Sequence, residues 1–418
     1  MKHDNISRGW LWVPTLYIAE GLPYVLLMTV SAVLFKRMGV SNAQLAFYTS
    51  LFGLPAMIKP LWSPLVDMFH TRRAWIIVMQ VLIALALAAI AFVIPGHVWF
   101  KASVASFLVM AFFSATHDIA ADGFYMLALP ERGQSFFVGI RATVFRLAML
   151  IGQGPLVMFA GFLESSYGDI PRAWAVVFYI LSALMAFIAL YHIIMLPHPP
   201  ADRSTRISSA AMVWREFADT FVRFFTKPGI LVAMLFMLLY KLPEAQLIKL
   251  IQPFLLDSRE AGGLALSTAQ VGFAYGTVGV IGLLSGGIIG GILVSRSGLR
   301  RWMMPMAWSM SLSCLAFVWL SSGTNPSFFM INVCVCVEQF GYGFGTTAYM
   351  LYLINFSKGQ HATANYAICT GVMSLGMMLP GMVAGWLQQT IGYGPFFIWT
   401  VACCVVTIVV ARLALRHC

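Results

Sequence analysis

Two aspartates, Asp118 and Asp122, stand in an otherwise apolar stretch of the chain. Because they are four residues apart, they share one face of a helix. A carboxylate among apolar residues is costly to ionise, so it either takes up a proton or pairs with a buried base. The first is the chemistry of proton-coupled transport, and the second is a structural role. For any single residue the sequence leaves both interpretations open.

Three further acids also lie well inside apolar stretches: Glu20, Glu244 and Glu338. Together with Asp118 and Asp122 they fall on the first, fourth, seventh and tenth of these stretches, which is every third one. A transporter assembled from three-helix repeats places equivalent helices around a central cavity. We therefore predict that these five acids line such a cavity and serve proton coupling.

Basic side chains in apolar stretches are candidates to hold an anionic substrate, since Arg and Lys bind carboxylates and phosphates. Arg146 and Arg141 are five residues apart, about 140° around a helix, and so point in different directions. We favour Arg146 for the cavity because Gln153 shares its face, while a structural ion pair is the alternative for Arg141. The other predicted substrate-binding residues are Lys59, Lys241, Tyr24 and Tyr125.

His117 precedes Asp118 and points about 100° away from it on a helix. We favour a core residue with satisfied hydrogen bonds, and a proton relay is the alternative. No set of residues typical of a hydrolase, a kinase or a metal enzyme occurs in the sequence. We therefore expect no enzyme activity and no cofactor, with a proton gradient as the driving force.

The composition defines the elements that must position these groups. Of 418 residues, 60% are hydrophobic and 10% are charged, and the mean hydropathy is +0.84. A soluble protein cannot bury so much apolar surface, so the sequence predicts an all-α membrane protein. The net charge of +11 lies mostly in short loops between apolar stretches, which argues against a nucleic-acid partner.

The apolar stretches amount to about twelve membrane spans. The predicted spans are 10–36, 42–66, 74–95, 100–129, 133–164, 171–197, 229–257, 268–295, 301–322, 326–357, 360–391 and 393–415. Residues 198–228 begin with a Pro-rich segment and continue with helical alternation of apolar and charged residues, either an amphipathic surface helix or a solvated linker helix. The predicted domains are thus a six-helix bundle (1–197), a cytoplasmic linker (198–228) and a second six-helix bundle (229–418).

The two predicted halves repeat one loop pattern. Asp67 is followed by Arg72 and Arg73 after the second span, and Ser295 is followed by Arg300 and Arg301 after the eighth. We interpret both as loops that hold helix ends together in one conformation. Sixteen Lys and Arg lie on the side of the termini and five on the opposite side, which predicts that both termini are cytoplasmic.

Several motifs resemble one family of transporters. They are Glu20-Gly-Leu-Pro-Tyr24, Lys59-Pro-Leu-Trp-Ser-Pro-Leu-Val-Asp67, His117-Asp-Ile-Ala-Ala-Asp122, Arg146-Leu-Ala-Met-Leu-Ile-Gly152 and Glu338-Gln-Phe-Gly-Tyr-Gly-Phe-Gly-Thr-Thr-Ala348. Together they resemble the AmpG muropeptide permeases, a branch of the major facilitator superfamily, over nearly the whole chain. The resemblance implies a twelve-helix fold of two pseudo-symmetric bundles, and it favours Asp118, Asp122, Lys59 and Arg146 as functional residues.

The resemblance also implies a proton-coupled importer in the bacterial inner membrane, which we expect to be a monomer. Its substrates would be N-acetylglucosaminyl-1,6-anhydro-N-acetylmuramyl sugars with or without a stem peptide, and its roles would be peptidoglycan recycling and β-lactam resistance. The alternatives are transport of another bulky anion, such as a siderophore or a coenzyme A ester, or export of drugs. Basic residues in the predicted cavity count against export of lipophilic cations. A non-transporting membrane sensor would need an effector domain, which the sequence lacks.

Overall fold

The computed structural model describes residues 4–63, 66, 69–200, 202, 221–323, 325–358 and 362–417. Eleven helical segments in these ranges, some of them made of consecutive helices, are long and apolar enough to span a membrane. The chain divides into two compact units, unit 1 (1–34 and 58–210) and unit 2 (35–57 and 211–418). Residues 35–57, which we expected in the first bundle, thus group with unit 2.

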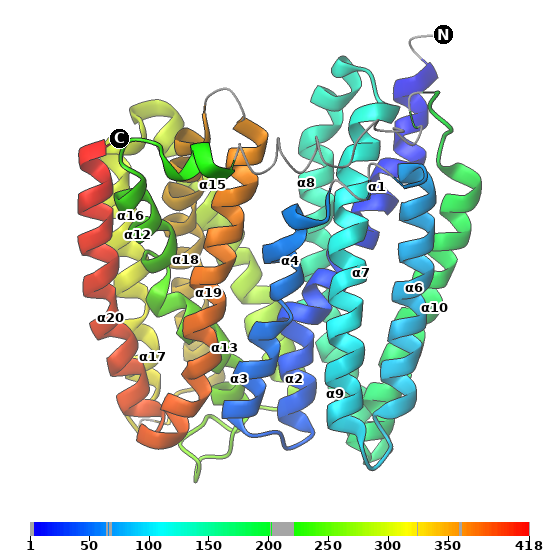
Figure 1. Cartoon of the computed structure of the whole chain (residues 1–418). Coiled ribbons are helices and arrows are strands. Elements are labelled where there is room, and N and C mark those ends of the chain that lie inside the picture. The colour runs from blue at the N-terminus through cyan, green and yellow to red at the C-terminus, as the bar shows by residue number, and fades with distance from the viewer. Residues whose placement is uncertain are drawn as a thin grey trace. The chain divides into compact units, whose positions relative to one another are not determined.

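Unit 1 contains the helices that carry three of the predicted acids, Glu20, Asp118 and Asp122 (Figure 1). Its elements are α1 (Asp4–Val25), η1 (Leu26–Val30), part of α2 (Ser31–Arg37), η2 (Lys59–Leu61), α6 (Arg72–Val93), α7 (Trp99–Ala128), α8 (Glu131–Gln153), α9 (Pro155–Tyr167) and α10 (Ile170–Met195). Within this unit, α6 packs between α7 and α10, and α1 packs along α8. The packing buries aromatic rings, among them Trp12, Phe124 and Phe137.

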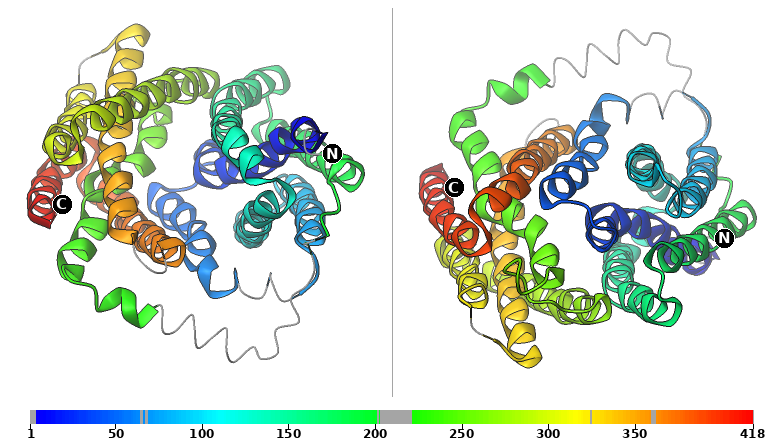
Figure 2. Two further views of the ribbon diagram at one scale, coloured as in Figure 1. Left: turned by 90° about the horizontal axis from the view of Figure 1, so that it is seen from above. Right: turned by 90° about the horizontal axis from the view of Figure 1, so that it is seen from below.

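Unit 2 holds the remaining helices (Figures 1 and 2). Its elements are α3 (Asn42–Leu51), α4 (Leu54–Ile58), α12 (Ile230–Leu239), α13 (Leu242–Leu256), α14 (Thr268–Val271), η3 (Gly272–Gly279), α15 (Val280–Ser297), α16 (Leu299–Ser313), α17 (Leu315–Leu320), α18 (Phe328–Ser357), α19 (Ala362–Ile391), α20 (Tyr393–Ala414) and η4 (Leu415–His417). Its core includes the rings of Phe236, Tyr240 and Tyr349. The hydroxyl groups of the two tyrosines donate to backbone carbonyls.

Helix interruptions fall where proline and glycine predict them. The predicted span 42–66 is divided: α3 ends at Leu51, and the turn at Pro60 starts η2 directly after α4. Likewise α12 and α13 meet just before Pro243, and α8 and α9 meet at Gly154-Pro155. In contrast, α19 continues through Pro380.

Glycines allow α15 and α18 to approach closely, as their spacing predicts. A β-carbon on Gly286 would lie 2.2 Å from the carbonyl oxygen of Phe340, and one on Gly343 would lie 2.1 Å from that of Leu283. Neither helix accepts a larger residue at these positions without moving. The backbones therefore pack directly against each other.

Candidate proton-coupling and substrate site

One face of α7 carries the centre of the candidate site. Asp118 and Asp122 are one turn apart, and each contacts a different cation of unit 1. Lys59 Nζ donates a hydrogen bond to Asp118 Oδ2, and the two side chains form an ion pair. Lys59 reaches it because α4 ends at Ile58 and Pro60 starts a tight turn, which presents the lysine at a break in the helix.

Asp122 binds Arg141 of α8 and Tyr17 of α1. The Arg141 Nη1 atom lies 2.8 Å from Asp122 Oδ1, and the Tyr17 hydroxyl donates to the same oxygen at 2.9 Å. Arg141 also donates to the Tyr17 hydroxyl at 2.7 Å. Its guanidinium carbon stands 5.0 Å from the ring centre of Tyr125, a cation–π contact. Three helices thereby meet at one carboxylate.

Glu20 adds a third carboxyl group. It lies one turn beyond Tyr17 on α1, and it interacts electrostatically with Asp118 and Asp122. Carboxylates that lie near one another repel, so binding a proton at one of them is favoured. One Glu20 oxygen, Oε2, is buried and has no hydrogen-bond partner. The cluster therefore combines three acids with two bases, which leaves one negative charge for a proton to neutralise.

The charged side chains of the cluster remain partly accessible. The Asp122 side chain is 48% exposed and that of Asp118 is 24% exposed. Charged groups at membrane depth face a wet cavity or the protein rather than lipid. A group that exchanges protons or binds a substrate must be reachable, and this partial exposure meets that requirement.

His117 points about 100° away from Asp118 on α7, within a chain of polar contacts that the sequence reasoning missed. Its Nε2 is 3.0 Å from Gln80 Nε2, and Gln80 Oε1 is 3.0 Å from His192 Nδ1. His192 Nε2 continues the chain to the Thr15 hydroxyl at 2.9 Å. The presence of Gln80 and His192 inside apolar stretches was the available signal. His117 Nδ1 has no hydrogen-bond partner, so the prediction of a fully satisfied core residue is not met.

The other predicted substrate-binding residues of unit 1 lie in varied surroundings. Arg146, which we favoured over Arg141, has an exposed side chain, whereas Arg141 is the arginine that pairs with Asp122. Tyr24 is 40% exposed and its ring contacts that of Phe145. Tyr125 is buried and donates to a backbone carbonyl of α8. Gln153 is the half-buried last residue of α8.

The predicted acids and lysine of unit 2 are buried more deeply. Glu244 and Glu338 are almost inaccessible, and Glu338 Oε1 has no hydrogen-bond partner. The Glu244 carboxylate is 3.7 Å from the thiol of Cys314. Lys241 Nζ stands 5.0 and 5.1 Å from the ring centres of Tyr342 and Tyr349. These residues form their own polar cluster within unit 2.

The predicted loop motif is organised by a residue that we did not single out. Asp67 lies outside the described residues, whereas Asp202 is buried and its two oxygens accept the backbone N–H groups of Arg72 (2.8 Å) and Arg73 (3.1 Å). The Arg73 guanidinium donates to carbonyls of Ile193 and Leu196 at the end of α10. The start of α6 is thus fastened to the chain that follows α10. Arg300 and Arg301 are exposed at the start of α16.

Helices of membrane-spanning length, interrupted by proline and glycine and carrying ion-paired acids at membrane depth, define a helical membrane transporter. No group of His, Cys, Asp and Glu in the described part of the chain is suited to hold a metal ion. The family model described as Major Facilitator Superfamily matches residues 15–364, and the chain belongs to this family. It is therefore a transporter rather than an enzyme.

Relatives agree with the predicted AmpG resemblance. The anhydromuropeptide permease of Escherichia coli K12 is 27% identical over 410 residues, which cover 96% of this chain and 79% of the permease. A Rickettsia conorii protein that carries the name AmpG 4 is 25% identical, with 92% of this chain and 91% of that protein covered. The fold matches the crystal structure of a bacterial homologue of the human lysosomal transporter Spinster, with a TM-score of 0.74, 15% identity and 98% and 97% coverage.

Proposed function

We propose that this protein is a proton-coupled symporter that imports anhydromuropeptides through the bacterial inner membrane. The observation that carries the proposal is the cluster of Glu20, Asp118 and Asp122 with Lys59 and Arg141. It holds more acids than bases at membrane depth, and one carboxyl oxygen lacks a partner. Such a cluster gains from binding a proton and, separately, offers two cations to an anionic substrate.

In the proposed mechanism Glu20 carries the proton. Without a proton, its carboxylate would stand beside Asp118 and leave the cluster one negative charge in excess. With a proton, Glu20 is neutral, and the two aspartates balance the two bases. Loading from the side of high proton concentration and release on the other side then couple the gradient to the conformational cycle.

The two cations provide the proposed substrate contacts. A substrate carboxylate that approaches Arg141 or Lys59 competes with Asp122 or Asp118 for the same N–H donors. When a cation turns to the substrate, the negative charge of the aspartates is less well neutralised, so the proton on Glu20 is held more tightly. Substrate binding and proton binding thereby favour each other, which is the thermodynamic requirement of a symporter.

The substrate class is inferred from the relatives and from the chemistry of the cluster. The E. coli relative is named an anhydromuropeptide permease. Anhydromuropeptides with a stem peptide carry carboxylates that suit Arg141 and Lys59, and exposed aromatic rings such as Tyr24 suit the faces of sugars. The excess of Lys and Arg on the side of the termini supports cytoplasmic termini.

Uptake into proteoliposomes tests the function. We expect labelled N-acetylglucosaminyl-1,6-anhydro-N-acetylmuramic acid to accumulate when the outside is acidic, and the accumulation to collapse on addition of a protonophore. Uptake that ignores the gradient would exclude proton symport. Absence of uptake, together with gradient-driven uptake of a siderophore or of a coenzyme A ester, would show that the transported anion is a different one.

A further inference from the structure

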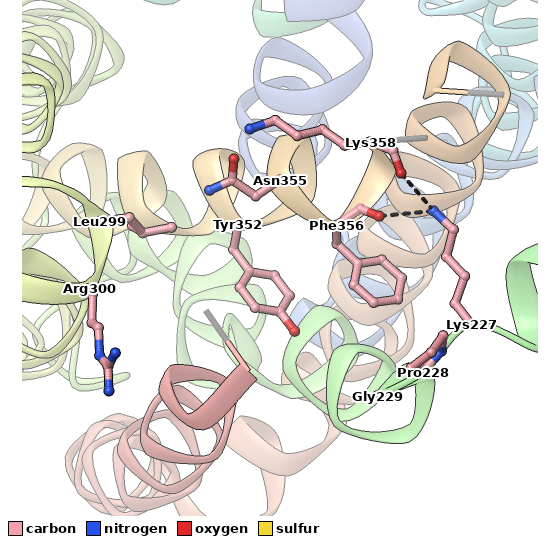
Figure 3. Close-up of a pocket in the computed structure, with 9 residues that line it drawn as sticks. All are labelled: Lys227, Pro228, Gly229, Leu299, Arg300, Tyr352, Asn355, Phe356 and Lys358. Carbon is pink, nitrogen blue, oxygen red and sulfur yellow. Dashed lines mark hydrogen bonds between the residues drawn. The ribbon is translucent and has the colours of Figure 1, made fainter. Parts of the chain in front are cut away.

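A basic pocket of about 820 Å³ opens at one end of unit 2. It lies where α18 ends and where α12 and α16 begin, which is the polar boundary of three candidate membrane spans. Figure 3 shows Tyr352, Asn355 and Phe356 of α18, with Lys227 on one side and Arg300 on the other. The lining residues of this basic pocket are Lys227, Pro228, Gly229, Leu299, Arg300, Tyr352, Asn355, Phe356 and Lys358.

The charge of the lining is entirely positive. Three of its nine residues, Lys227, Arg300 and Lys358, are cations, and none is acidic. Arg300 and Lys358 are exposed. Lining cations without a lining carboxylate create a local positive potential that attracts anions. The pocket is therefore suited to an anionic ligand.

Lys227 is fixed in place rather than free to turn into water. Its Nζ donates to the backbone carbonyls of Phe356 at 3.0 Å and Lys358 at 3.3 Å (Figure 3). It also stands 5.3 Å from the ring centre of Phe356 and 5.8 Å from that of Phe224. Partial burial lowers the pKa of Lys227. An anion in the pocket would offset that loss of hydration and favour the charged form.

Two helices begin at the pocket and add to its positive potential. The residues before them, Gly229 and Gly298, have positive φ angles of 76° and 81°, and neither provides a side chain that caps the first N–H groups. The first N–H group of α12, that of Ile230, donates to the carbonyl of Lys227 at 3.2 Å. N–H groups at a helix start that lack a partner carry partial positive charge and bind phosphate well. The start of α16 contributes Leu299 and Arg300 directly to the lining.

Exposed apolar side chains next to the pocket indicate the kind of anion. Phe221, Val222 and Phe225 precede Lys227 in a helical segment, and they are 43%, 62% and 38% exposed. Phe225 contacts Phe224, whose ring in turn packs against Phe356 of the pocket. Leu231 on α12 is 71% exposed. A ligand with an anionic head and apolar chains could place the head in the basic pocket and the chains along these exposed apolar side chains.

We propose that the basic pocket binds the phosphate of an anionic phospholipid headgroup, whose acyl chains lie along the exposed apolar side chains beside it. Basic pockets between membrane helices at the polar boundary bind such headgroups in other proteins. The phosphate lies between Lys227 and Arg300, near the helix starts, and Lys358 supplies further positive charge. The bound lipid ties the end of α18 to the starts of α12 and α16, and it does so whatever substrate the protein transports.

Native mass spectrometry of the purified full chain tests the site with phosphatidylglycerol, phosphatidylcholine and inorganic phosphate as probes. We expect retention of phosphatidylglycerol in preference to phosphatidylcholine. Arg300→Gln with Lys358→Gln should weaken phosphatidylglycerol binding by roughly 25-fold, since each basic residue near an anionic lipid contributes about fivefold. Arg301→Gln is the matched control, because Arg301 is exposed and adjacent but does not line the pocket.

The possible outcomes separate the lipid from other ligands. Equal binding of phosphatidylglycerol by the double variant and by the Arg301→Gln control would overturn the site. Equal retention of phosphatidylcholine would overturn the selectivity for anions. If inorganic phosphate displaces the lipid or raises the melting temperature as much as phosphatidylglycerol does, the ligand is free phosphate and the lipid assignment is wrong. Circular dichroism establishes that each variant is folded, and no transport measurement enters the test.

Discussion

Arg141 Nη1 lies 2.8 Å from Asp122 Oδ1, and the Tyr17 hydroxyl binds both residues. The contact joins α8 to α7 and α1 through one carboxylate. Because Asp122 is about half exposed, the pair is open to competition from a solute. An ion pair of this kind both holds helices together and responds to a substrate.

Replacing Arg141 by Gln should reduce the initial rate of uptake by about tenfold or more, because Asp122 would lose its cation and the substrate would lose an anchor. The control is Arg132→Gln, which removes an exposed arginine from the same helix. Uptake into proteoliposomes with equal amounts of inserted protein provides the measurement. Equal rates for both variants would show that the Arg141–Asp122 pair is dispensable.

Replacing Glu20 by Gln should imitate the protonated side chain. The amide is neutral, as the protonated carboxyl group is, so we expect exchange of labelled for unlabelled substrate to persist while gradient-driven accumulation is lost. Glu164→Gln is the control, since Glu164 is a buried glutamate of the same unit that accepts a hydrogen bond from Trp174 Nε1. Full accumulation by Glu20→Gln would remove Glu20 as the proton carrier.

Replacing Gly343 by Ala should lower the melting temperature. The new β-carbon would stand 2.1 Å from the carbonyl oxygen of Leu283, so α15 and α18 must move apart at a cost of about 1–3 kcal/mol. The control is Gly291→Ala on α15, where a β-carbon meets no atom within 4 Å. Unchanged melting of Gly343→Ala in detergent would contradict direct backbone packing of these helices.

Replacing Asp202 by Ala should destabilise the protein by about 1 kcal/mol, because the first N–H groups of α6 would lose their acceptors. Asp202→Asn retains one carbonyl oxygen and should fall between the wild type and the Ala variant. Thermal unfolding followed by circular dichroism measures the series. A melting temperature of the Ala variant equal to that of the wild type would mean that solvent replaces this cap without loss.

Several features of the protein follow from local sequence alone. Apolar stretches of membrane-spanning length predict the helices, and Pro60 and Pro243 mark interruptions because proline lacks an N–H group, whereas α19 continues through Pro380. The four-residue step from Asp118 to Asp122 places both on one face of α7. These properties depend on residues within a turn or two of each other, so periodicity is sufficient to determine them.

Partners distant in the sequence required the tertiary structure. Helical spacing separated the directions of Arg141 and Arg146, but only the packing of α8 against α1 and α7 placed Arg141 beside Asp122. In the same way, Asp202 reaches α6 across 130 residues, and Gln80 joins His117 to His192 from three different helices. The sequence by itself determined which groups are too costly to leave in lipid. The fold decided which of them meet, because that choice depends on helix rotation and crossing, which no local pattern encodes.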